Sequence, residues 1–384
     1  MEKVIKNEEV VSIKNKLPES FFKYLEENSV DIEAVYNDET LKNLPRYVRI
    51  NPRRNVNIDD INQELGIELK PIEWIPNVYS LPSDIKISQL TAYKEGNLYG
   101  IDLSSCAVVF SLDPLSDDHV LDMCCSPGSK LCYIADIMRS KDPNGKGTLT
   151  GVDINEHRLN ICRNLVKKYN HNDLISLYCE DGTTFSKIPN NSNGYDKVLV
   201  DAECTHDGSI KHLLKFQDES TIKSKKIEKV MPDQIAQPIS NKERKRREKQ
   251  KLEHLERMEK KKIKLNNTWT IENFEERVMN EEKLNNIVSL QKKLLVNAYH
   301  LTKVNGIIVY STCSFTRSQN EDVVSYVLDQ NEETKGKLVL IDPFPEDILA
   351  KMPVTPGYLE KTIRFDPKTS KSGGMFIAKL RKIK

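Results

Sequence analysis

The chain has 384 residues, of which 38% are hydrophobic and 30% are charged, and its formal net charge is +1. A chain of this length exceeds one ordinary domain and can build a stable core without disulfides. The small net charge means that any nucleic-acid-binding surface must come from local basic patches rather than from the field of the whole molecule.

The cysteines and the apolar segments exclude several classes of protein. The eight cysteines do not form evenly spaced pairs along the chain, which argues against a secreted disulfide framework. No Cys-x-x-Cys pair occurs, so we expect no metal site. The sequence contains no run of about 18 apolar residues, so it predicts no membrane span. The opening MEKVIKNEEVVSIKNKL does not resemble a signal or transit peptide. A reducing compartment is expected: the cytoplasm, the nucleus or the nucleolus.

The first 95 residues have a pattern of their own. The stretch FFKYLEENSVDIEAVYN, residues 21–37, is typical of helix, and YVRINPRR, residues 47–54, predicts a short strand that ends at Pro52 before a basic pair. We therefore expect a small α+β domain over residues 1–95.

From about residue 119 onward, short β-branched runs alternate with helix-like stretches. The runs are HVLDMCC (119–125), GTLTGVDI (147–154), LISLYCED (174–181), KVLVDAEC (197–204), GIIVYSTC (306–313), KLVLIDP (337–343) and MFIAKLRK (375–382). A buried helix could give the same pattern, but the flanking glycines and the Val/Ile content favour strands. The alternation predicts βαβ units and an α/β fold over residues 96–384, with a mostly parallel sheet covered on both faces.

A charged segment at about 217–266 interrupts this alternation between the fourth and fifth runs. It includes NKERKRREKQKLEHLERMEKKKIK, in which acids and bases alternate at the spacing that supports a solvated helix. Two interpretations stay open: an exposed charged insertion, or a basic arm that contacts nucleic-acid phosphates or acts as a nuclear address. The helix expected after it carries one apolar stripe, made by Leu290, Leu294, Leu295, Ala298 and Leu301.

The residues that end the predicted strands are the functional candidates, because ligands of open parallel sheets bind beyond the carboxyl ends of the strands. The first strand ends in VLDMCCSPGSK, where Pro127 and Gly128 form a tight turn before a helix. Small side chains there let backbone N–H groups approach a ligand closely. Any βα turn can use Gly and Pro, so an ordinary turn remains the alternative.

The next two strands end in acids. Asp153 follows the second strand, where such folds hydrogen-bond ribose hydroxyls, and it could at the same time cap the following helix. Asp181 follows the third strand and could hold an adenine amino group, or simply stabilise a turn.

The fourth and fifth strands end in thiols. A single cysteine at a strand end is usually a small buried hydrophobe. Here Cys204 and Cys313 occupy corresponding ends, in DAECTHDG and YSTCSFTRSQNED. Since neighbouring parallel strands end at the same edge, we expect both thiols to face one ligand.

Taken in order, these segments resemble the RNA (cytosine-5)-methyltransferases of the Sun class, the RsmB/Nop type, which use S-adenosylmethionine. VLDMCCSPGSK resembles that family's Asp-Leu-Cys-Ala-Ala-Pro-Gly-Gly-Lys, and residues 290–324 resemble its Tyr-Ser-Thr-Cys-Ser stretch closely. RYVRINPRR and SGGMFIAKLRK resemble an N-terminal motif and the closing strand. The resemblance runs from about residue 46 to the last residue. It implies a Rossmann-like methyltransferase sheet, and an N-terminal domain that contacts RNA.

The resemblance also implies roles for single residues. Cys313 is the expected nucleophile toward carbon 6 of cytosine, and Cys204 assists release of the product. Asp201 is expected to hydrogen-bond the edge of the ring, with Lys130 beside it to orient the base and lower the pKa of the thiol. The residues expected to bind S-adenosylmethionine through their backbone are Cys124, Cys125, Ser126, Pro127, Gly128, Ser129 and Lys130, and the others are Asp153, Arg158, Asp181 and Asp201.

The chain departs from the family around Cys204. The family pattern is Asp-Ala-Pro-Cys-Ser-Gly-x-Gly, and here Glu203 replaces proline, Thr205 replaces serine and His206 replaces glycine. A carboxylate beside a thiol tends to raise its pKa, while His206 could lower it or accept a proton. Ser126 and Ser129 are milder departures, and Ile101 stands where the family commonly has glutamine.

Two functions are therefore open. The first is a monomeric methyltransferase acting on carbon 5 of cytosine in tRNA or rRNA, on a base that has to be unstacked or single-stranded. The alternative is a catalytically idle RNA-binding ribosome-assembly factor of the same fold. A methyltransferase that acts on DNA or protein is disfavoured by the Thr-Cys-Ser position of the nucleophile.

Overall fold

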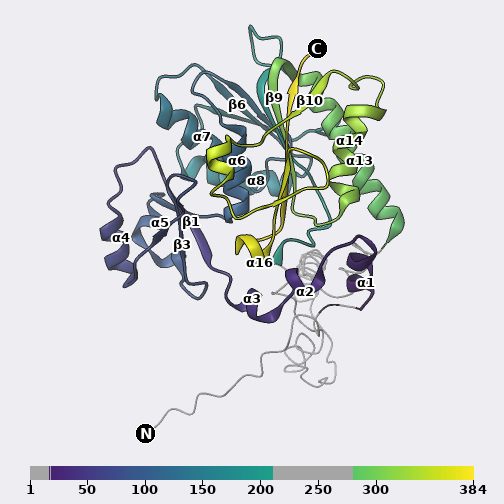
Figure 1. Cartoon of the computed structure of the whole chain (residues 1–384). Helices are drawn as coiled ribbons and strands as arrows, with labels where there is room; N and C mark the ends of the chain where they lie inside the picture. Colours follow the sequence, from purple (N-terminus) through teal and green to yellow (C-terminus); the bar gives the residue numbers. More distant parts are fainter. Residues whose placement is uncertain (1–16, 18, 211–279) are drawn as a thin grey trace, which may run out of the picture.

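The computed structural model describes residue 17 and residues 19–210 and 280–384 (Figure 1). The predicted charged insertion at about 217–266 lies outside the described residues, so its two interpretations stay open. Within the described part of the chain, no helix is both long and apolar enough to cross a bilayer.

The small domain is a four-stranded antiparallel sheet with short helices. Its strands are β1 (Arg46–Ile50), β2 (Lys70–Pro71), β3 (Val78–Leu81) and β4 (Leu98–Gly100), in the order β2-β3-β1-β4. Helices α4 (Ile58–Leu65) and α5 (Thr91–Lys94) belong to the same lobe, beside the main sheet (Figure 1). Strand β4 pairs with β1, so this sheet continues five residues beyond the expected boundary at residue 95.

The main sheet has nine strands, and its parallel part matches the predicted runs. The parallel strands lie in the order β9-β8-β5-β6-β7. They are β5 (His119–Asp122), β6 (Thr148–Val152), β7 (Ile175–Tyr178), β8 (Tyr195–Asp201) and β9 (Thr302–Thr312). The order extends outward on both sides from β5, which confirms the predicted Rossmann-like sheet.

The other four strands are antiparallel. They are β10 (Leu338–Ile341), β11 (Thr355–Pro356), β12 (Thr362–Phe365) and β13 (Met375–Lys382). Strand β13 pairs with β9, β12 and β10. The sheet is therefore mixed, and the prediction of a mostly parallel sheet is wrong for this half.

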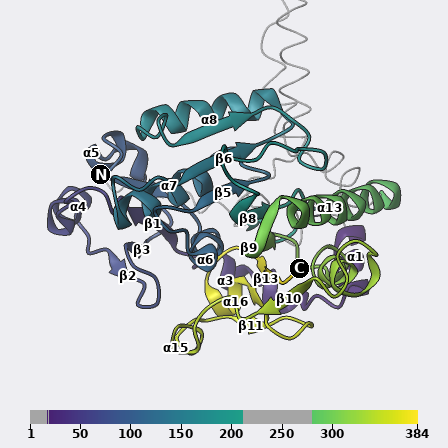
Figure 2. The same ribbon diagram turned by 90° about the horizontal axis from the view of Figure 1, so that it is seen from above.

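Helices cover both faces of the main sheet, as predicted (Figure 2). On one face lie α6 (Leu103–Leu112), α7 (Ser129–Lys141) and α8 (Glu156–Lys168), and on the other lie α13 (Glu281–Leu301) and α14 (Glu321–Ser325). The predicted stripe of α13 is buried at Leu294, Leu295, Ala298 and Leu301 and half-buried at Leu290. Two short helices, α15 (Glu346–Leu349) and α16 (Pro367–Ser370), lie in the C-terminal part of the chain.

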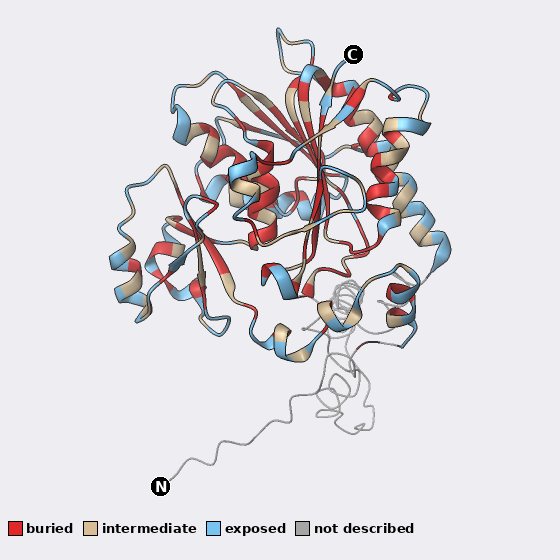
Figure 3. Cartoon of the chain, in the orientation of Figure 1, coloured by how far each residue is buried: buried red, intermediate tan, exposed pale blue. Residues whose placement is uncertain are grey.

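Burial is concentrated in the central strands of the main sheet and in the helix sides that face it (Figure 3). Val198, Leu199 and Val200 of β8 are all fully buried, which is why this segment reads as a continuous apolar run with no alternation.

The first helices pack on loops that follow strands of the main sheet. They are α1 (Glu19–Glu27), α2 (Ile32–Val35) and α3 (Asp38–Lys42). Phe21 and Tyr36 from this N-terminal helical segment form one apolar cluster with Ile210 and Phe315. The stretch predicted as helix within the α+β domain thus forms helices, but it covers loops that follow β8 and β9.

A buried ion cluster joins the small sheet to the main domain. The Arg49 guanidinium of β1 lies 2.8 Å from the Asp136 carboxylate of α7, and both side chains are almost completely buried. Arg53 and His171 approach the same carboxylate at 3.6 and 3.1 Å. Of the basic pair after β1, only Arg54 is therefore exposed.

Candidate active site

A cavity of about 1060 Å³ lies beyond the carboxyl ends of β5, β6, β8 and β9. Nine of the residues predicted for the site line it: Cys124, Ser126, Pro127, Lys130, Asp153, Arg158, Asp181, Asp201 and Cys313. The antiparallel half of the sheet contributes as well, because Gly373, Gly374 and Met375 form part of the wall.

Four predicted residues do not line this cavity. Cys125 faces the core, with its backbone N–H donating to Val152. Gly128 has φ 105°, a left-handed conformation that favours glycine, and a Cβ there would lie 2.8 Å from the Cys162 sulfur. Ser129 is exposed at the start of α7, and Cys204 is buried directly behind Cys313. The contacts expected of Cys125, Gly128 and Ser129 are those of their backbone, and they stay predictions.

The predicted cofactor side is built around Asp153. Its carboxylate accepts hydrogen bonds from the backbone N–H groups of Ser126, at 3.3 Å, and of Asn155, at 2.8 Å. Asn155, and not Asp153, caps α8, so the capping alternative for Asp153 is wrong. The Ser126 hydroxyl is buried and has no hydrogen-bond partner among the described residues. It is a polar atom on the cavity wall that a ligand can satisfy.

Arg158 and Asp181 complete this side. The Arg158 guanidinium donates to the Ser126 carbonyl at 2.9 Å and lies 3.4 Å from the Glu203 carboxylate. Arg158 thus links the turn after β5 to the loop after β8, which carries Cys204. The Asp181 carboxylate accepts from the backbone N–H and the hydroxyl of Thr183, both at 2.8 Å. Asp181 thus stabilises a turn while it borders the cavity.

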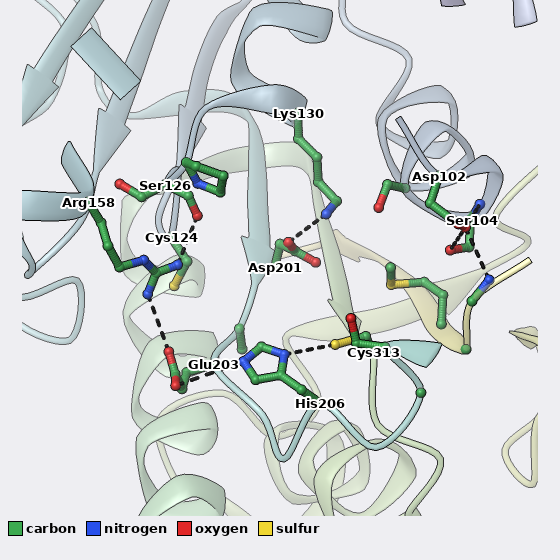
Figure 4. Close-up of a pocket in the computed structure, with 18 of the residues that line it drawn as sticks. Asp102, Ser104, Cys124, Ser126, Lys130, Arg158, Asp201, Glu203, His206 and Cys313 are labelled. Carbon is green, nitrogen blue, oxygen red and sulfur yellow. Dashed lines mark hydrogen bonds and ion pairs between the residues drawn. The ribbon is translucent and has the colours of Figure 1, made fainter. Parts of the chain in front are cut away.

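Asp201, at the end of β8, is held from two directions. One carboxylate oxygen accepts from the Lys130 ammonium at 2.8 Å (Figure 4). The other accepts from the Ser311 hydroxyl at 2.7 Å. Burial alone would lower the pKa of Lys130, but the adjacent Asp201 carboxylate raises it. Lys130 therefore stays positively charged inside the cavity, close to Cys313.

The two thiols meet, and His206 joins them. The Cys204 and Cys313 sulfurs are 3.3 Å apart because β8 and β9 are neighbouring parallel strands. The Nδ1 atom of His206 lies 3.0 Å from the Cys313 sulfur and 3.6 Å from the Cys204 sulfur (Figure 4). Sequence reasoning gave His206 an effect on the pKa of the Cys204 thiol or a role as proton acceptor, but it did not predict that the imidazole lies 3.0 Å from the Cys313 sulfur.

The two thiols share one negative charge, and His206 is charged beside them. Burial would raise the pKa of Cys204, but the hydrogen bond from Cys313 and the charge of His206 lower it well below its ordinary value. The same sulfur–sulfur hydrogen bond, together with burial, raises the pKa of Cys313. The Cys204 thiolate raises the pKa of His206 to about 9, although burial opposes this. The pair therefore carries one thiolate, and an imidazolium balances it.

The loop from Glu203 to Gly208 is fixed by close contacts. His206 has φ 58°, the left-handed region that glycine occupies at lower cost, so the histidine is kept there at some conformational expense. At Gly208, a Cβ would lie 2.3 Å from the Cys313 carbonyl oxygen, so only glycine fits between the two catalytic loops. The Gln291 side chain of α13 donates to the Glu203 carbonyl at 2.8 Å.

Several supporting residues were not found by sequence reasoning. Ser311 lies on β9 two residues before Cys313, and its hydroxyl orients Asp201, a role that sequence reasoning did not assign. The Tyr36 hydroxyl donates to the Asp207 carbonyl at 2.5 Å across 171 residues. No local signal identifies a contact of that length. By contrast, the Gly373–Gly374 pair was visible in the resemblance.

Comparison with known proteins places this arrangement in a family. The profile of the family described as "16S rRNA methyltransferase RsmB/F" matches residues 109–234 and 267–381, more than half of the chain. The tRNA (cytosine(49)-C(5))-methyltransferase of Pyrococcus abyssi (strain GE5 / Orsay) is 25% identical over 342 residues, which are 87% of this chain and 87% of the relative.

Eukaryotic relatives are longer than this chain. A 28S rRNA (cytosine-C(5))-methyltransferase of Mus musculus is 28% identical over 94% of this chain, which corresponds to 36% of the mouse protein. The Arabidopsis thaliana 25S rRNA (cytosine-C(5))-methyltransferase NSUN5 is 27% identical, and the chain spans 48% of it. The chain thus spans about half or less of these two relatives.

Solved structures agree in fold. The structure described as NSun6 from Pyrococcus horikoshii with SFG has a TM-score of 0.62 at 16% identity, and covers 96% of this chain and 99% of that one. A methyltransferase homolog protein from the same organism has a TM-score of 0.56 at 21% identity, covering 95% of this chain and 100% of that one.

Proposed function

The chain belongs to the RsmB/F family of RNA (cytosine-5)-methyltransferases, and from this premise we propose that it methylates carbon 5 of a cytosine in tRNA or rRNA through a covalent cysteine adduct. The observation that carries the proposal is the meeting of Cys313 and Asp201 on the wall of a cavity that Asp153 also lines, with Cys204 directly behind Cys313.

The residues around Asp153 fit S-adenosylmethionine, the cofactor of this family. The unpaired Ser126 hydroxyl, the Asp153 carboxylate and the Asp181 turn line one side of a cavity large enough for a nucleoside and a base. When bound, S-adenosylmethionine supplies an activated methyl group. Asp153 would hold ribose hydroxyls, and Asp181 the adenine edge.

Asp201 prepares the cytosine for attack. Carbon 5 of cytosine is a poor nucleophile until a thiolate adds to carbon 6, and that addition is easier when the ring nitrogen is protonated or hydrogen-bonded. Lys130 and Ser311 fix both oxygens of Asp201 in position. A group held in this way needs little reorganisation when charge develops on the ring.

Cys313 is the nucleophile in this scheme, because it lines the cavity whereas Cys204 lies behind it. The thiolate is shared, since one proton can pass across the 3.3 Å contact between the sulfurs. The reactive form has the proton on Cys204 and the charge on Cys313, beside the Lys130 and His206 cations. Its sulfur adds to carbon 6, and carbon 5 accepts the methyl group.

Product release reverses the addition. A base takes the proton from carbon 5, and the bond between carbon 6 and the Cys313 sulfur breaks, which leaves a thiolate. The Cys204 thiol lies directly against the departing sulfur and can hydrogen-bond to it. Cys204 thereby assists release although it does not touch the cavity.

Methyl transfer to RNA tests the proposal. We expect the full chain to transfer label from S-adenosylmethionine to tRNA or rRNA, and Cys313→Ala to abolish transfer. Cys179→Ala is the matched control, because Cys179 is exposed and does not line the cavity. Intact RNA binding without transfer would support the idle assembly factor instead. Transfer that survives Cys313→Ala would assign the nucleophile to Cys204.

The class of RNA needs its own experiment. The named relatives act on tRNA or on rRNA. Mapping 5-methylcytosine in both RNA classes from cells with and without the gene identifies the substrate. Loss of the modification from neither class would contradict the proposed function.

A further inference from the structure

Cys204, His206 and Cys313 together form a cluster of donor atoms that suits a metal ion. Their two sulfurs and the Nδ1 nitrogen lie within 4.8 Å of one another. The separate distances are 3.3 Å between the sulfurs, and 3.0 and 3.6 Å from the nitrogen to Cys313 and Cys204. Two thiols and an imidazole are the donor set that zinc and similar soft divalent cations prefer.

The spacing is close to that of a tetrahedral site. Zinc–sulfur bonds of about 2.3 Å and zinc–nitrogen bonds of about 2.0 Å set the donor separations at roughly 3.5–3.8 Å. The nitrogen–sulfur distance of 3.6 Å to Cys204 already fits, and the distances of 3.0 and 3.3 Å need to expand by about half an ångström. This contraction is what hydrogen bonds between the same atoms produce.

The surroundings supply the remaining features of a metal site. Cys204 is buried at the back, while His206 and Cys313 line the cavity, so a fourth position faces open space. The other ring nitrogen of His206, Nε2, lies 4.0 Å from a carboxylate oxygen of Glu203 (Figure 4). A carboxylate beside the second nitrogen of a ligating histidine fixes its orientation and strengthens it as a ligand.

We propose that Cys204, His206 and Cys313 bind one Zn²⁺ or similar soft divalent cation, with an open fourth position toward the cavity. The two residues that depart most from the resembled family pattern, Glu203 and His206, supply the carboxylate and the imidazole. The expectation of no metal site rested on the absence of a Cys-x-x-Cys pair. Cys204 and Cys313 are 109 positions apart, so that criterion does not apply to them. Metal binding itself does not depend on the proposed function. Only an inhibition of methyl transfer by the bound ion would rest on it.

Titration of the metal-free full chain with Co²⁺ tests the site. We expect one equivalent to produce a thiolate-to-cobalt charge-transfer band, which Zn²⁺ then removes. His206→Gly, which restores the family residue, should weaken affinity at least tenfold. Glu203→Gln should weaken the affinity for Co²⁺ roughly tenfold, because His206 loses the carboxylate beside its second ring nitrogen. Cys179→Ala should change nothing, and circular dichroism checks that each variant is folded.

Alkylation of Cys313 gives a second readout that needs no enzymatic activity. Iodoacetamide should modify Cys313 slowly in the presence of Zn²⁺ and rapidly after chelation, with a smaller difference in Glu203→Gln. No charge-transfer band, or equal affinity in wild type and His206→Gly, would overturn the proposal. A protein that binds Co²⁺ but never methylates RNA would contradict the proposed function and leave the metal site standing.

Discussion

At the scale of single residues, the proposed activation of the base depends on the placement of Asp201. Both of its oxygens are held, by Lys130 and by Ser311. We expect Asp201→Asn to lower kcat for methyl transfer by roughly 10²–10³-fold, since a preorganised partner of the developing charge is lost. Ser311→Ala frees only one oxygen and should cost less. A Ser311→Ala loss as large as that of Asp201→Asn would mean that Asp201 does not contact the base.

Cys204 can be tested apart from Cys313. We predict that Cys204→Ala accumulates a covalent protein–RNA adduct, visible as an RNase-sensitive band on a denaturing gel. The reason is that the Cys313 sulfur would lack the thiol that lies 3.3 Å away and stabilises it as it departs. The double variant Cys204→Ala, Cys313→Ala should form no adduct. Absence of an adduct in the single variant would mean that the altered loop does not serve release.

The strand-end residues were predictable because each closes an apolar run, and parallel strands end at one edge. The precise partners were not. His206 meets Cys313 through a left-handed backbone turn, which no local pattern reports. The Asp153 cap was predicted wrongly because Asn155 lies two positions further on and competes for the same role.

At the scale of elements, the N-terminal helical segment supports the catalytic loops. Tyr36 is fully buried, and its hydroxyl donates to the carbonyl of Asp207, in the loop that carries Cys204 and His206. We expect Tyr36→Phe to lower the free energy of unfolding by about 1–3 kcal/mol, because a buried carbonyl loses its partner. It should also change the rate at which Cys313 is alkylated.

Tyr195→Phe is the matched control for this effect. The Tyr195 hydroxyl donates to the Lys187 carbonyl at 3.0 Å, away from the thiols. It should alter denaturant unfolding but not the alkylation rate of Cys313. Equal alkylation rates in wild type and Tyr36→Phe would show that α2 does not influence the catalytic loop.

The elements found and missed by sequence reasoning differ in length and burial. All seven predicted runs contain strands, since β-branched residues between glycines and acids were unambiguous. Strand β11 was missed because it has only two residues, and β12 because the charged Arg364 interrupts its short apolar run. Their antiparallel pairing with β13 depends on contacts between segments, which periodicity does not report.

At the scale of the whole molecule, the Arg49–Asp136 pair fastens the small sheet to the main domain. We expect Asp136→Asn to cost about 3–5 kcal/mol of unfolding free energy at pH 7, because it leaves Arg49 buried without an opposite charge. Asp173→Asn removes an ion pair of Arg139 that is exposed, and should cost less than about 1 kcal/mol. Comparable losses would mean that the buried pair does not join the two parts.

The same pair predicts a pH dependence. Burial would raise the pKa of Asp136, but Arg49 and His171 lower it below its ordinary value. A lowered folded-state pKa stabilises the protein above the unfolded value of about 3.9, and this contribution is lost as the pH falls through the folded value. Denaturant unfolding at several pH values should therefore show the difference between wild type and Asp136→Asn shrinking below about pH 4.

Strand β13, which lies beside β9, has a consequence for biosynthesis. Gly374 donates to the Gly208 carbonyl at 2.8 Å, and β13 covers the strand that ends at Cys313. A ribosome delivers Cys204 and Cys313 first and β13 last among the described strands. Until then β9 has an unpaired edge, and pairing between distant segments is slow. A nascent chain thus holds both thiols before it holds Gly373, Gly374 and Met375, which supply the last part of the cavity wall.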